Sequence, residues 1–146
     1  MKPAIFPPPV PGDSRWRIPY GGLVLSVAVA AWRREQWLIA RGPATAAGRP
    51  RPVLPSIVLS HGEPPVRAAR RLLRSLGLKP GTPILVGAWS RRARRGHWEV
   101  AFVFAAPVMG RTQKTRAAAE PEFRDARDPA VVSAFRAAGI SFADVE

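Results

Sequence analysis

The order of elements in the middle of the chain constrains its fold more than any other feature. A short apolar run over Val53–Leu59 predicts a strand, and the cluster His61-Gly62-Glu63-Pro64-Pro65 then breaks any regular element. The next stretch, Val66–Leu76, carries its apolar residues at helical spacing, and Gly77 is a suitable C-cap. A strand followed at once by an amphipathic helix predicts a sheet with a helix packed on it.

Strand-like segments flank this unit on both sides. Leu23–Ala31 alternates and is partly β-branched, and Trp37–Arg41 follows a polar turn as the return strand of a hairpin. A second hairpin is predicted from Ile84–Trp89 and Trp98–Ala105, with its tip at residues 91–96. The chain therefore has hairpins before and after its central helix.

The remaining segments complete the prediction. Residues 42–52 and 108–127 are rich in small or polar residues and predict loops. Asp128 is a suitable N-cap for a helix over Pro129–Ala138, which Gly139 would end. The order β-β-β-α-β-β-loop-α predicts an α/β (α+β) protein with a mixed sheet flanked by helices.

The length of 146 residues is that of one domain. Six prolines within residues 1–20 predict an extended arm, so the expected division is this arm and a single domain over 21–146. The longest apolar run, Gly21–Trp32, is too short to cross a bilayer, and no membrane partner is expected. The absence of cysteine excludes disulfides and thiolate metal sites and fits a cytoplasmic protein.

The chain is strongly basic, with 23 Lys and Arg against 10 Asp and Glu and a net charge of +13. Most of the basic residues are arginines, which bind phosphate in a bidentate manner. This charge favours nucleic acid or a phosphorylated ligand as partner, and a protein partner is a further possibility. The alternative is compositional, because GC-rich codons favour Arg, Ala, Pro and Gly together.

The segment from Leu54 to Leu78 resembles the Nudix box and the turn before it. The family pattern runs Gly, five residues, Glu, seven residues, Arg-Glu, an aliphatic residue, any residue, Glu-Glu, any residue, Gly and an aliphatic residue. Here seven residues separate Glu63 from Arg71, as the pattern requires, and Gly77-Leu78 is similar to its closing pair. The resemblance covers roughly residues 21–140 and implies a Nudix-like α/β/α sandwich with a mixed sheet.

The chain departs from this pattern at its carboxylates. Leu72 stands in place of the Glu after Arg71. The stretch of the Glu-Glu pair, one residue short, holds no carboxylate and is occupied by Arg74, Ser75 and Leu76. The sequence has no Asp or Glu anywhere from Pro64 to Trp98.

In the Nudix family these carboxylates hold Mg²⁺ or Mn²⁺, which clamps a pyrophosphate and activates water. Glu63 is the one box carboxylate that remains, and a single carboxylate is a poor site for a hard cation. The resemblance therefore implies no confident catalytic residue, no metal site and no cofactor; Mg²⁺ or Mn²⁺ would be needed only by a divergent hydrolase. Glu63 itself is interpreted as a charge that the helix dipole favours.

Two arginine clusters are candidate contacts for phosphate or nucleic acid. The first lies on the predicted helix, largely off its apolar face, and in the family's place for metal it would bind a nucleotide phosphate directly: Arg67, Arg70, Arg71 and Arg74. The second lies at the hairpin tip between Trp89 and Trp98: Arg91, Arg92, Arg94 and Arg95. For both clusters the alternative is an ordinary solvated surface.

The other chemically active side chains have simpler interpretations. Four acids late in the chain are expected to offset nearby arginines: Glu120, Glu122, Asp125 and Asp128. His61 and His97 have no partner at a catalytic spacing.

Three functions stay open. The first is a Nudix-fold pseudoenzyme that has lost metal-dependent pyrophosphohydrolase activity and binds a nucleotide, RNA or a protein. The second is a divergent Nudix hydrolase that cleaves nucleoside diphosphate derivatives. The third is a basic structural component of a ribonucleoprotein assembly.

Overall fold

The computed structural model describes residues 22–44, 50–92, 98–112 and 121–145. The predicted arm over residues 1–20 lies outside these ranges. The strands of the described part are β1 (Leu23–Arg33), β2 (Gln36–Ala44), β3 (Pro50–Val53), β4 (Ser56–Val58), β5 (Leu78–Pro80), β6 (Ile84–Arg92), β7 (Trp98–Gly110) and β8 (Glu122–Asp125). The helices are α1 (Pro65–Ser75), α2 (Pro129–Ala137) and the short α3 (Phe142–Val145).

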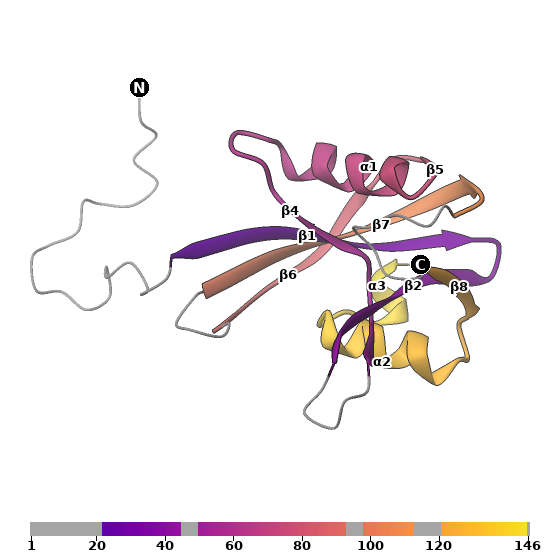
Figure 1. Ribbon diagram of the computed structural model, residues 1–146. Coiled ribbons are helices and arrows are strands. Elements are labelled where there is room, and N and C mark those ends of the chain that lie inside the picture. The colour runs from indigo at the N-terminus through magenta and orange to yellow at the C-terminus, as the bar shows by residue number, and fades with distance from the viewer. Residues whose placement is uncertain (1–21, 45–49, 93–97, 113–120, 146) are drawn as a thin grey trace, which may run out of the picture.

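The strands join into one mixed sheet with helices on both faces. The main path runs β3-β2-β1-β7-β5, while β4 pairs with β1, β6 with β7 and β8 with β2. The β1–β7 pair is parallel and the other pairs are antiparallel. Figure 1 shows α1 on one face of this sheet and α2 on the opposite face. The predicted fold class, an α/β/α sandwich with a mixed sheet, is confirmed.

Strand β1 lies at the centre of both hydrophobic cores. Its side chains alternate between the two faces, so Val27 and Val29 pack in the core beneath α1 while Ala28 and Ala30 pack in the core beneath α2. All four are buried. Burial on both faces explains why this strand is an almost continuous apolar run rather than a clean polar–apolar alternation.

The two longer helices begin and end where the sequence predicts. Helix α1 has proline at its first position and ends at Ser75, with Leu76 as its C-cap and Gly77 following with a φ of 82°. Helix α2 is capped by Asp128, whose Oδ1 accepts the Ala130 N–H at 2.8 Å. Both predicted helices are confirmed to within one residue.

The predicted loops were partly wrong. The loop at 42–52 is shorter, because β2 continues to Ala44 and β3 begins at Pro50. The single strand predicted over Val53–Leu59 is instead divided between β3 and β4, and Pro55, which lacks an N–H, lies between them. The region 108–127 contains the end of β7 and all of β8. Its polar residues pair with β2 through backbone hydrogen bonds, which carry no hydrophobic signature in the sequence.

Candidate functional site

The segment that resembles the Nudix box is held together by an ion pair between Glu63 and Arg71. Arg71 Nε donates to Glu63 Oε2 and Arg71 Nη2 donates to Oε1, both at 2.9 Å. The Ser60 N–H donates to the same carboxylate at 3.2 Å, and Arg71 Nη2 also donates to the Val58 carbonyl at 3.2 Å. The spacing of eight residues thus joins the loop before α1 to the second turn of the helix.

This contact corrects the role that the sequence suggested for Glu63. The first turn of α1 contains no acidic residue, and Glu63 lies in the loop before it. The hydrogen bond from Arg71 lowers the pKa of the Glu63 carboxyl, the Ser60 N–H adds to this effect, and desolvation opposes it. Both carboxylate oxygens are therefore already occupied by donors from the protein.

Two of the positions where the family pattern has further carboxylates are part of the core. Leu72 and Leu76 are 1% and 0% exposed and pack between α1 and the sheet. Ser75 is exposed and its Oγ donates to the Leu72 carbonyl at 2.6 Å. In the described ranges, no three His, Asp or Glu side chains lie together as metal ligands. Because hard cations need several oxygen donors, the residues of α1 do not fit Mg²⁺ or Mn²⁺.

The two predicted arginine clusters lie in different surroundings. On α1, Arg67, Arg70, Arg71 and Arg74 lie on the outer side, opposite the buried leucines. At the hairpin, Arg91 donates to Glu99 Oε2 at 3.2 Å and its guanidinium lies 4.7 Å from the centre of the Trp89 ring. The side chains of the other predicted hairpin contacts lie outside what the structure describes: Arg92, Arg94 and Arg95.

Two of the four late acids offset an arginine, as predicted. Arg124 donates to Glu122 at 2.9 Å and to Asp128 at 3.2 Å, and these two hydrogen bonds raise the pKa of the guanidinium. Asp125 instead accepts the Arg127 N–H at 2.9 Å. His61 is exposed in the turn before α1. Glu120 and His97 fall outside the described residues.

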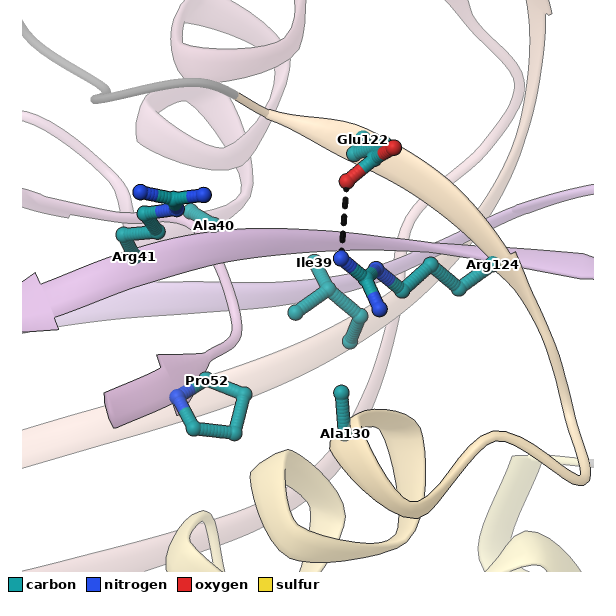
Figure 2. A pocket seen from close by; sticks show the side chains of 7 residues that line it. All are labelled: Ile39, Ala40, Arg41, Pro52, Glu122, Arg124 and Ala130. Atoms are coloured by element: carbon teal, nitrogen blue, oxygen red, sulfur yellow. Dashed lines mark hydrogen bonds and ion pairs between the residues drawn. The ribbon is translucent and has the colours of Figure 1, made fainter. Parts of the chain in front are cut away.

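A pocket that the sequence did not indicate lies on the α2 side of the sheet. Its volume is about 330 Å³, and it is lined by Ile39, Ala40, Arg41, Pro52, Glu122, Arg124 and Ala130. Figure 2 shows these side chains around the pocket, together with the ion pair between Glu122 and Arg124.

Strand register explains how these residues meet. In β2, Ile39 lies opposite Glu122 of β8 and Arg41 lies opposite Pro52 of β3, so all four side chains share the face that α2 covers. Ala130, in the first turn of α2, forms a wall. No sequence motif indicates this site, because parts of β2, β3 and β8 fall in segments that were predicted to be loops.

The pocket and the α1 arginines lie on opposite sides of the sheet. Ile39 belongs to the core beneath α2, whereas Leu72 of α1 belongs to the core on the other face. The two regions therefore do not form a single site. No helix in the described ranges is both long and apolar enough to span a membrane.

Comparison with known proteins identifies structures that share this architecture. No protein-family model and no curated protein sequence matches the chain. Solved structures do match. The MutT Nudix hydrolase from Burkholderia pseudomallei has a TM-score of 0.59 at 20% identity, covering 76% of this chain and 97% of its own. A Nudix hydrolase from Nitrosomonas europaea has a TM-score of 0.58 at 15% identity, covering 84% and 95%.

A third solved structure has a TM-score of 0.60 at 18% identity and covers 76% of this chain and 84% of its own. It is described as a possible asymmetric diadenosine tetraphosphate hydrolase from Jonesia denitrificans. Identities of this size establish the fold and not the activity. The architecture, the connection of the box-like segment to α1 and these similarities together show that the chain has the Nudix fold.

Proposed function

We propose that this protein is a Nudix-fold module that binds a phosphate-bearing nucleotide without metal and does not hydrolyse it. The observation that carries this proposal is the composition of α1. Leu72 and Leu76 fill the core where the family pattern has carboxylates, and Glu63 is held by Arg71. A helix built in this way retains the packing of the fold and has no oxygen ligands to offer a divalent cation.

The pocket on the α2 side is the site we assign to the ligand. Its volume of about 330 Å³ lies within the range of small-molecule sites, and Ile39, Pro52 and Ala130 give it apolar walls. Arg41 supplies a guanidinium at its rim, which suits a phosphate group. The net charge of +13 further favours an anionic ligand.

The pair of Arg124 with Glu122 and Asp128 has a positioning role in this proposal. Its charges are largely satisfied within the protein, so Arg124 holds β8 against the start of α2 and fixes the width of the pocket. Arg41 lines the same pocket, and we propose that its guanidinium contacts the phosphate of the bound ligand. Asp128 cannot reorient towards a ligand without releasing the N–H of Ala130.

Titration calorimetry with ADP in the presence of EDTA tests this function. Arg41→Ala should weaken ADP binding by about 10-fold to 100-fold, because it removes a charge-assisted hydrogen bond. Arg51→Ala is the matched control, since Arg51 is exposed on β3 next to Pro52 and, by strand alternation, faces away from the pocket. Equal affinities in the two variants, or no ADP binding in the wild type, would reject the pocket.

A divergent hydrolase is the second candidate, because the matched structures of this fold are described as hydrolases. Phosphate release from nucleoside diphosphate derivatives with Mg²⁺ or Mn²⁺ separates the two functions. The binding module predicts no detectable release. Metal-dependent turnover that disappears in Glu63→Gln would favour the hydrolase instead.

A further inference from the structure

The outer face of α1 is a continuous stripe of arginines. Arg67, Arg70, Arg71 and Arg74 follow one another at spacings of three, one and three residues, so all four lie on the same side of the helix. Each is exposed or half-exposed. With a rise of about 1.5 Å per residue, the stripe extends over roughly 10 Å.

The charge of this stripe is balanced at one position. Arg71 is paired with Glu63, and Arg67 acts on that carboxylate only through its field. Arg70 and Arg74 form no ion pair with any residue that the structure describes. The sequence around the stripe supplies no other counter-charge, because positions 64–97 contain no Asp or Glu. Three guanidinium groups therefore remain available to an external anion.

We propose that this arginine stripe binds the sugar–phosphate backbone of a nucleic-acid strand. A guanidinium group donates two parallel hydrogen bonds to a phosphate, and a row of such groups can contact successive phosphates along a strand. Each neutralised phosphate releases condensed counterions, which makes binding favourable and salt-dependent. The interaction reads backbone rather than sequence, because guanidinium groups in a row contact phosphates and not base edges.

The burial pattern of α1 argues against an acidic membrane as the partner. A helix that lies in a membrane surface inserts its apolar face among the lipids. The apolar face of α1 is already buried in the core, through Ala68, Ala69, Leu72 and Leu73. An acidic membrane would therefore contact only the arginine side chains, with no apolar surface available for insertion. A small phosphate ligand is equally disfavoured, because it needs a concave site and the stripe lies on a convex helix surface.

The test compares two triple variants with the same loss of charge. The stripe variant carries Arg67→Gln, Arg70→Gln and Arg74→Gln, and retains Arg71 because it holds Glu63. The control variant carries Arg51→Gln, Arg127→Gln and Arg136→Gln, all exposed and located on β3 or at α2 rather than beside α1. Binding is measured by fluorescence anisotropy with single-stranded RNA and DNA of one sequence between 50 and 200 mM KCl. Far-ultraviolet circular dichroism confirms that both variants are folded.

Three contacts to a single strand contribute about 2 to the slope of log affinity against log salt. The stripe variant should lose this part of the slope. Between 50 and 200 mM KCl, the affinity of the wild type should therefore decrease by a factor about 20 times larger than that for the stripe variant. The control variant should retain the wild-type slope. A preference between the RNA and DNA arms identifies the natural strand, since both offer the same phosphate chemistry.

The proposal is overturned if the two variants lose the same slope, because the net charge then acts as a diffuse field. It is also overturned if the wild type binds neither strand, or if only vesicles containing phosphatidylserine distinguish the variants. Arg41→Ala should leave strand binding unchanged, because the pocket lies across the sheet. Failure of the nucleotide site and failure of the stripe are thus separate results.

Discussion

Restoring a carboxylate at position 72 would test whether the box-like helix serves as core or as a metal site. Leu72 is 1% exposed, and Leu72→Glu would place an ionisable group between α1 and the sheet. Losing the buried side chain costs about 1.5–3 kcal/mol. Burying a neutral carboxyl without a partner adds about 1–3 kcal/mol. The variant should therefore be less stable by roughly 2.5–6 kcal/mol even when the carboxyl is protonated.

Ionisation adds a further, pH-dependent loss. Burial raises the pKa of a carboxyl above its unfolded value of about 4.3. Between these two pKa values the folded state binds more protons than the unfolded state. The free energy of unfolding therefore falls by about 1.4 kcal/mol for each unit that the pH rises. Where burial raises this pKa above 7, the loss at pH 7 is about 4 kcal/mol, which approaches the whole stability of a marginally stable domain.

Urea unfolding followed by tryptophan fluorescence, between pH 4.5 and 7.5, measures both contributions. Leu72→Gln has a similar shape without a titrating group, so the difference between the two variants isolates ionisation. Ser75→Glu adds the same charge at an exposed position of α1 and should change stability by no more than about 1 kcal/mol. If Leu72→Glu were as stable as the wild type at pH 7, or bound Mg²⁺, the reasoning from the core would be refuted.

Three further predictions use the same unfolding and binding assays. Leu73 is 0% exposed, so Leu73→Ala should lower the free energy of unfolding by about 3–5 kcal/mol, and a loss below about 1 kcal/mol would contradict its place in the core. Since Arg71 lowers the pKa of Glu63, the stability that Glu63 adds over Glu63→Gln should be fully present above about pH 4.3 and be lost as the pH falls through the folded pKa; a difference independent of pH would exclude this ion pair. Arg91→Ser should alter the affinity for single-stranded RNA by less than about 2-fold, because Glu99 already neutralises Arg91. A larger loss of affinity would indicate that the hairpin contacts nucleic acid.

The absence of carboxylates on α1 has a structural consequence as well as a chemical one. A carboxylate row at the inner side of a helix needs a cation to be stable there, because like charges repel and burial is costly. With Leu72 and Leu76 in place, apolar contacts join α1 to the sheet. We therefore expect the stability of this protein to be insensitive to EDTA.

The sequence alone determined the elements whose signal is local. Helix α1 was predictable because its leucines recur at helical spacing between a proline cluster and Gly77. Helix α2 was predictable from Asp128 and Pro129, since capping involves groups two or three residues apart. The strands of the two hairpins were predictable from short apolar runs bounded by turn residues, and the spacing of Glu63 and Arg71 identified the segment that resembles the Nudix box.

Only the tertiary structure decided which side chains meet. Strand β8 is polar and short, and it forms because β2 offers an edge for backbone pairing, which the sequence does not record. The pocket combines Arg41, Pro52, Glu122 and Ala130 from four elements, and their meeting depends on strand register rather than on any motif. Likewise, the sequence named the arginines of α1, but the side of the helix they occupy was set by packing. The leucines are buried in the core, because burying apolar surface is favourable and burying unpaired charge is not. The arginines therefore face the solvent.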